Sequence, residues 1–176
     1  RAQILKVDGQ NIKVKFVDYG NDETTTLTRL KHLAPKHVSL PVQAIRCSLH
    51  GVDCQRGTWT EGASHKFEDL TMDKNLISKI ITKTKDGVHV VSLVDVSGES
   101  ELNISEALVR MGLAIRAGSP VSIMKPEKPQ QSVGPPSPPI RNLTQSFKDM
   151  DVPIGKSCMA VASWVNSPAE FFCQLG

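Results

Sequence analysis

The segment Val14-Lys15-Phe16-Val17-Asp18-Tyr19-Gly20-Asn21 decides the fold. It continues a stretch in which Ile12, Val14 and Phe16 alternate with other residues, the period-2 pattern of a half-buried strand. Gly20 and Asn21 suit left-handed backbone angles, so we expect a tight turn over residues 18–23. The segment holds the only Tyr of the 176-residue chain, three residues after a Phe.

The flanking residues predict further short strands. Residues 2–7 alternate loosely and end at Asp8-Gly9, which is a hairpin turn signal. The β-branched run from Thr24 to Leu27 predicts a strand, and residues 30–33 predict a helical turn stopped by Pro35. Short strands joined by tight turns indicate a small barrel.

Residues 41–116 predict a different unit. Strands are expected over residues 42–49, 76–82 and 88–96, with a turn at Asp86-Gly87 between the last two. A helix is expected within residues 59–72, capped by Thr58 and Thr60, and another over residues 106–111, capped by Asn103 or Ser105. This order predicts an α+β module built on a β-barrel.

The composition changes after Gly118. Seven of the eleven prolines fall between Pro120 and Pro139, which predicts an extended linker without a core. Two strand-like pieces then follow, over residues 158–165 and 170–175. A hairpin alone is not a domain, so we interpret these strands as the start of a second unit.

Overall composition excludes several classes of protein. No apolar run approaches the roughly 20 residues needed to span a bilayer, so no membrane partner is expected. A net charge of +3 does not require a nucleic-acid partner. The four cysteines have no metal-site spacing, which predicts free thiols and neither a metal nor a cofactor.

Phe16, Tyr19 and Asn21 suggest a site for a methylated cation. Two aromatic faces attract the charge, and the Asn amide accepts the remaining N–H. The alternative is that both rings belong to the core of a small barrel. Asp18, Asp22 and Glu23 add carboxylates that could steer a basic peptide, although Asp18 alone more often caps its own turn.

The segment Phe16-Val17-Asp18-Tyr19-Gly20-Asn21-Asp22-Glu23 resembles the signature of an extended Tudor domain, and Leu40 to Leu49 resembles the family's passage into its nuclease-like half. The resemblance implies a mainly β fold with minor α: an SH3-like Tudor barrel joined to a staphylococcal-nuclease-like, OB-type barrel. We therefore expect a Tudor core over residues 1–38, the nuclease-like half over 39–117, a proline-rich linker over 118–150, and the opening strands of a following repeat over 151–176.

The resemblance also implies a function. Multi-Tudor germline proteins bind symmetrically dimethylated arginine in Arg-Gly-rich tails of PIWI-type proteins, which predicts a cytoplasmic role in germ granules (nuage) and the piRNA pathway with other germ-granule proteins as partners. Phe16 and Tyr19 resemble the second aromatic pair of the family's cage, and Asn21 resembles its arginine-contacting amide. The family's first aromatic pair is expected before Arg1.

Two other function classes are considered. Nuclease activity is rejected because Asp53, Asp69 and Asp95 are isolated and the arginines lie in unrelated elements, so no enzyme activity is expected. A degenerate repeat could act only as a scaffold, or contact RNA weakly through a basic run (Lys79, Lys83 and Lys85).

One structural hypothesis follows from the resemblance. The strands over residues 158–165 and 170–175 are expected to complete the nuclease-like barrel, within one molecule or between molecules. Contacts with residues 42–49 or 76–96 would test it.

Overall fold

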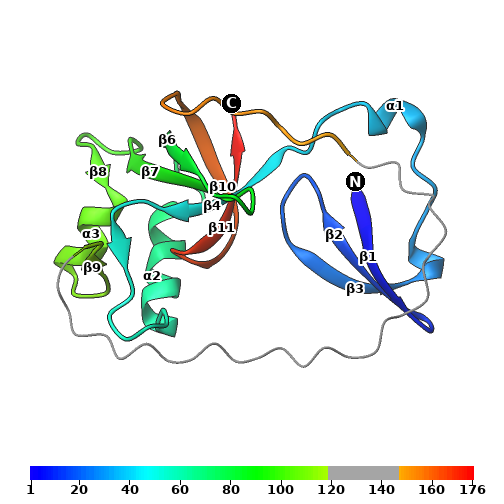
Figure 1. The fold of residues 1–176 in the computed structure, drawn as a ribbon, viewed down its shortest axis with the longest axis horizontal. Coiled ribbons are helices and arrows are strands. Elements are labelled where there is room, and N and C mark those ends of the chain that lie inside the picture. The colour runs from blue at the N-terminus through cyan, green and yellow to red at the C-terminus, as the bar shows by residue number, and fades with distance from the viewer. Residues whose placement is uncertain (119–146) are drawn as a thin grey trace.

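The structure, a computed structural model, describes residues 1–118 and 147–176. Figure 1 shows two neighbouring lobes, a three-stranded sheet and a larger barrel with two helices packed beside it. The proline-rich linker predicted for residues 118–150 lies outside the described residues except at its two ends. Residues 147–150 pack on the fold, because the amide of Val42 donates to the Lys148 carbonyl at 3.0 Å.

The first lobe is an antiparallel sheet in the order β1 (Ala2–Asp8), β2 (Asn11–Phe16), β3 (Asp22–Thr26). Asp8 pairs with Asn11 across a two-residue turn in which Gly9 has φ +58°. Ile12 and Val14 are buried while their neighbours in β2 are exposed or half-buried. The pairing of the three strands confirms the predicted strands and the hairpin turn. The alternating burial in β2 arises because successive side chains of a strand point to opposite faces of the sheet.

The connection to the second lobe differs from the prediction. A 3₁₀ turn over Leu27–Arg29 and the short helix α1 (Pro35–Val38) replace the single helical turn expected over residues 30–33. Pro35 begins a helix and does not stop one. The first helical position needs no backbone N–H donor, so proline is tolerated there.

The second lobe is a closed barrel. Its strands are β4 (Ala44–Leu49), β11 (Glu170–Leu175), β10 (Ser157–Ser167), β6 (Leu76–Lys83) and β7 (His89–Asp95), in that order, and a parallel β4–β7 pair closes the ring. Strand β11 pairs with β4, and β10 pairs with β6, in the same chain. The predicted contact of the C-terminal strands with residues 42–49 and 76–96 is therefore confirmed.

Two helices and three short strands complete this lobe. Helix α2 (Glu61–Thr71) begins after Thr60, whose side chain accepts a hydrogen bond from the Ala63 amide. Helix α3 (Ile104–Arg110) begins after Asn103, whose side chain accepts from the Glu106 amide. Both are N-caps of the predicted kind. The short strands are β5 (Val52–Asp53), β8 (Leu102–Asn103) and β9 (Ile115–Arg116).

The main core lies inside the barrel and beneath its helices. Phe67 of α2 meets Phe171 of β11 edge to face, with 5.0 Å between ring centroids and 65° between ring planes. Both rings are fully buried. The C-terminal hairpin thus supplies core residues to a barrel whose other strands lie before residue 96.

The cysteines lie within or beside this core. All four are free, and Cys47, Cys54 and Cys173 are buried while Cys158 is half-buried. Within the described residues, no helix is both long and apolar enough to cross a membrane.

Candidate functional site

The turn over residues 16–21, here called the signature turn, connects β2 to β3. The Phe16 carbonyl accepts from the amides of Tyr19 (3.2 Å) and Gly20 (2.7 Å), and the Phe16 amide donates to the Asn21 carbonyl (2.9 Å). Gly20 has φ +94°, whereas Asn21 is not left-handed. Of the two predicted left-handed residues, only glycine takes that conformation, at no steric cost.

The signature turn brings together the three predicted cage residues. Phe16 is half-buried at the end of β2, Tyr19 is 57% exposed, and Asn21 is half-buried just before β3. In the described parts of the chain, neither ring packs on another aromatic ring and the Asn21 amide group makes no hydrogen bond. Of the three predicted cage residues, Tyr19 is therefore the most exposed.

Each predicted steering carboxylate faces a basic side chain. Asp18 binds Arg1 through two hydrogen bonds, Asp22 lies 3.1 Å from Lys13, and Glu23 lies 3.0 Å from Arg29. The hydrogen bond from Arg1 holds the pKa of Asp18 below its usual value of 3.8. Basic side chains of the same chain therefore partly neutralise all three carboxylates. The two hydrogen bonds from Arg1 also give Asp18 a structural role.

Sequence reasoning missed the side chains that approach the turn from the C-terminal hairpin. The Ser163 hydroxyl donates to the Tyr19 carbonyl at 2.8 Å, and the Gln174 amide group donates to the Asp18 carbonyl at 2.6 Å. Phe172 lies directly against Gly20. No local sequence pattern predicts these contacts, because more than 140 residues separate the partners in sequence.

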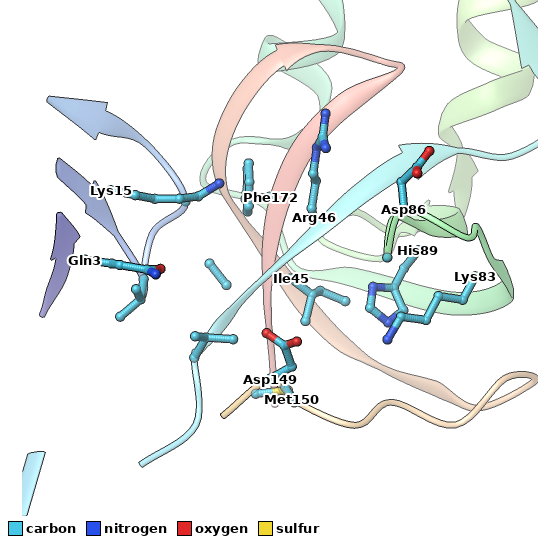
Figure 2. Close-up of a pocket in the computed structure, with 15 residues that line it drawn as sticks. Gln3, Lys15, Ile45, Arg46, Lys83, Asp86, His89, Asp149, Met150 and Phe172 are labelled. Carbon is cyan, nitrogen blue, oxygen red and sulfur yellow. The ribbon is translucent and has the colours of Figure 1, made fainter. Parts of the chain in front are cut away.

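A cavity of about 290 Å³ lies between the two lobes. Figure 2 shows Lys15 reaching from the sheet toward Phe172 of the barrel; the Lys15 Nζ lies 4.6 Å from that ring's centroid. Gly20 and Val17 also line the cavity, but none of the predicted cage residues does. The cavity therefore lies beside the turn that carries the predicted cage residues and does not include them.

His89 is the buried polar side chain of this cavity. It is 4% exposed, and neither ring nitrogen has a hydrogen-bond partner of good geometry in the described structure. Burial, followed by the charge of Lys83, lowers the pKa of His89 below 6.5. Burial therefore favours the neutral form of the ring.

The described residues contain no group of three or more His, Cys, Asp or Glu side chains that could hold a metal ion. The acids considered for nuclease chemistry are engaged locally. Asp53 accepts from the Cys54 amide, Asp95 accepts from the Ser97 amide, and Asp69 faces Lys66.

Comparison with known proteins connects this geometry to a family. Residues 1–51 match the model of the Tudor domain. Over 99% of its length the chain is 31% identical to Tudor domain-containing 6 of Danio rerio, of which it spans 9%. The chain therefore corresponds to a small part of that relative.

Two solved structures are similar in fold. One is the extended Tudor domain TD3 of mouse TDRD1, solved in complex with a MILI peptide that contains dimethylarginine. It is 32% identical to this chain, with a TM-score of 0.62, and the match covers 67% of this chain and 62% of that one. A variant of the Papi extended Tudor domain from Drosophila melanogaster, in complex with a dimethylated Piwi N-terminal peptide, is 27% identical with a TM-score of 0.60, over 66% of each chain.

Proposed function

We propose that the chain is a non-enzymatic reader of symmetrically dimethylated arginine, because residues 1–51 match the model of the Tudor domain and the fold is that of extended Tudor domains. The main support for this proposal is the signature turn. Within six residues it holds two aromatic side chains and the Asn21 side-chain amide, which makes no hydrogen bond in the described structure. The TDRD1 and Papi structures described above hold dimethylarginine peptides, and the same Papi variant has also been solved with an unmethylated Piwi peptide.

We propose that Phe16 and Tyr19 bind the methylated guanidinium by their ring faces and that the Asn21 amide oxygen accepts its remaining N–H. Methylation reduces the hydration of the cation, so removing it from water costs less and the attraction to the rings dominates. Tyr19 is the best placed of the three for a ligand arriving from solvent, because more than half of its surface is exposed.

We further propose Arg-Gly-rich tails of PIWI-type proteins as ligands, in cytoplasmic germ granules and the piRNA pathway. This part rests on the family resemblance and on the Piwi peptide bound by the Papi domain. Asp22 and Glu23 are proposed to raise the association rate of such basic tails, while Asp18 mainly holds Arg1. Replacing Asp22 and Glu23 by their amides should then lower the association rate more at low salt than at high salt.

The test is a titration with two Arg-Gly peptides that differ only in symmetric dimethylation of one arginine. Each ring contact is worth roughly 0.5–2 kcal/mol, so we expect a preference of about tenfold for the methylated peptide. Tyr19→Ala should remove that preference. Leu27→Ala, which truncates a side chain that is 72% exposed and lies outside the turn, is the matched control.

Equal binding of the two peptides would overturn the reader proposal and leave a scaffold role.

A further inference from the structure

The C-terminal hairpin of β10 and β11 holds the backbone of the signature turn at two adjacent peptide groups. Ser163 donates to the Tyr19 carbonyl at 2.8 Å, and its hydroxyl also lies 3.3 Å from the Phe172 carbonyl. Gln174 donates to the Asp18 carbonyl at 2.6 Å. Neither carbonyl takes part in the bonds that close the turn itself, which all involve Phe16. The hairpin therefore adds restraints that the local turn lacks.

A third contact between the same hairpin and the turn is made by Phe172, which packs against Gly20. A Cβ on Gly20 would lie 2.1 Å from Cγ of Phe172, so the backbone at Gly20 already touches the ring. Phe172 is 5% exposed and packs beside Trp164, with 5.8 Å between ring centroids. This ring is a rigid support that leaves the turn no room to move toward the barrel.

The Tyr19 side chain depends on these backbone restraints. It is exposed, and in the described residues its hydroxyl group makes no hydrogen bond and its ring packs on no other ring. The backbone from which it projects therefore sets where the side chain begins and limits the positions that the ring can reach. An aromatic cage works through preorganised ring faces, because a mobile ring must be ordered when the ligand binds.

We propose that Ser163, Phe172 and Gln174 are positioning residues of the dimethylarginine site, acting on Tyr19 through the backbone of Asp18, Tyr19 and Gly20. This inference rests on the proposed function for its ligand. It makes the site a product of both lobes: one supplies the ring, and the other restrains the backbone that carries it. Methyl-dependent binding then requires the C-terminal hairpin even though that hairpin carries none of the proposed cage residues.

The experiment uses the full chain with Ser163→Ala and Gln174→Glu, each of which removes a donor to the turn. Ser163→Thr keeps the hydroxyl and is the rescue variant. Ser157→Ala on the exposed start of β10 and Gln10→Glu in the β1–β2 turn are matched controls, since both side chains are exposed and neither makes a hydrogen bond or ion pair within the described structure.

Two readouts are needed. The first is affinity for the methylated and unmethylated peptides; one lost hydrogen bond predicts about a fivefold loss for the methylated peptide alone. The second is hydrogen exchange at the amides of Tyr19 and Gly20, which should become several-fold faster. The Met72 amide, which donates to the Glu68 carbonyl at 2.8 Å at the C-terminal end of α2, reports whether the second lobe stays intact.

The outcomes separate the two proposals. If the unaltered protein does not distinguish the peptides, the reader proposal fails, and exchange at the turn still decides whether the hairpin positions it. Unchanged exchange at Tyr19 and Gly20 in both variants would overturn the positioning proposal. So would equal acceleration at Met72, which would mean general destabilisation, or failure of Ser163→Thr to restore slow exchange.

Discussion

The guanidinium of Arg1 forms a bidentate ion pair with the carboxylate of Asp18: Nε donates to Oδ2 at 3.0 Å, and Nη2 donates to Oδ1 at 2.5 Å. The same guanidinium donates to the carbonyls of His37 (2.8 Å) and Pro41 (2.8 Å), which lie at the entrance to the second lobe. One half-buried cation thus joins the signature turn to the segment that connects the two lobes.

Replacing Asp18 by Asn should reduce stability in a pH-dependent way. Because Arg1 lowers the pKa of Asp18 below 3.8, the carboxylate stabilises the fold above that pH, and the contribution disappears as pH falls through the lower folded-state pKa. We expect Asp18→Asn to lose about 1–2 kcal/mol at pH 7 in urea unfolding. Near pH 2 the difference from the unaltered protein should shrink.

The control for that measurement is Asp8→Asn. The Asp8 carboxylate lies 3.6 Å from Lys6 and is 79% exposed, so its loss should be hardly measurable. A deficit for Asp18→Asn that is independent of pH would argue against the ion pair as its cause.

Gly20→Ala should destabilise the protein for two separable reasons. An alanine at φ +94° is strained, and its Cβ would overlap the Phe172 ring. We expect a loss of roughly 2–4 kcal/mol, of which backbone strain accounts for about 1–2 kcal/mol. Gly87→Ala isolates the strain, because Gly87 has φ +80° and open space around its Cβ. Similar losses for both variants would contradict the close approach of Phe172.

Phe171→Ala should show that the C-terminal hairpin is part of the barrel core. Removal of the buried ring leaves a cavity beside Phe67, and such truncations cost about 3–5 kcal/mol. Val161→Ala on the same hairpin removes a side chain that is 47% exposed and should cost well under 1 kcal/mol. Urea unfolding of both variants measures the difference, and a small effect of Phe171→Ala would mean that the hairpin does not close the barrel.

The cysteines should differ in reactivity toward an alkylating reagent at pH 8. A hydrogen bond with Cys173, together with burial, raises the pKa of the Cys47 thiol well above 9.0, so almost no thiolate is present. Burial also raises the pKa of Cys158, but its side chain is only half-buried. Mass spectrometry should find Cys158 labelled before Cys47 and Cys173, with all four labelled alike in denaturant. Early labelling of Cys47 would indicate that the barrel opens.

Local sequence patterns sufficed for most elements of this fold. Alternation around Ile12 and Val14 predicted β2, and Thr60 and Asn103 marked the starts of α2 and α3, because capping and period-2 burial depend on neighbours in sequence. The turn at Leu30 to Leu33 was wrongly predicted, since helical preference over four residues is weak and Pro35 favours either the end or the start of a helix.

The candidate site also has a part that the sequence predicted and a part that only the tertiary structure revealed. Phe16, Tyr19 and Asn21 could be found from sequence because a single tight turn gathers them, although their role as a cage stays a prediction. What holds that turn came only from tertiary structure: Ser163, Phe172 and Gln174 reach it across the junction between lobes. Contacts between residues so distant in sequence arise from how strands pair and close a barrel, and no local propensity encodes which carbonyl a distant serine will meet.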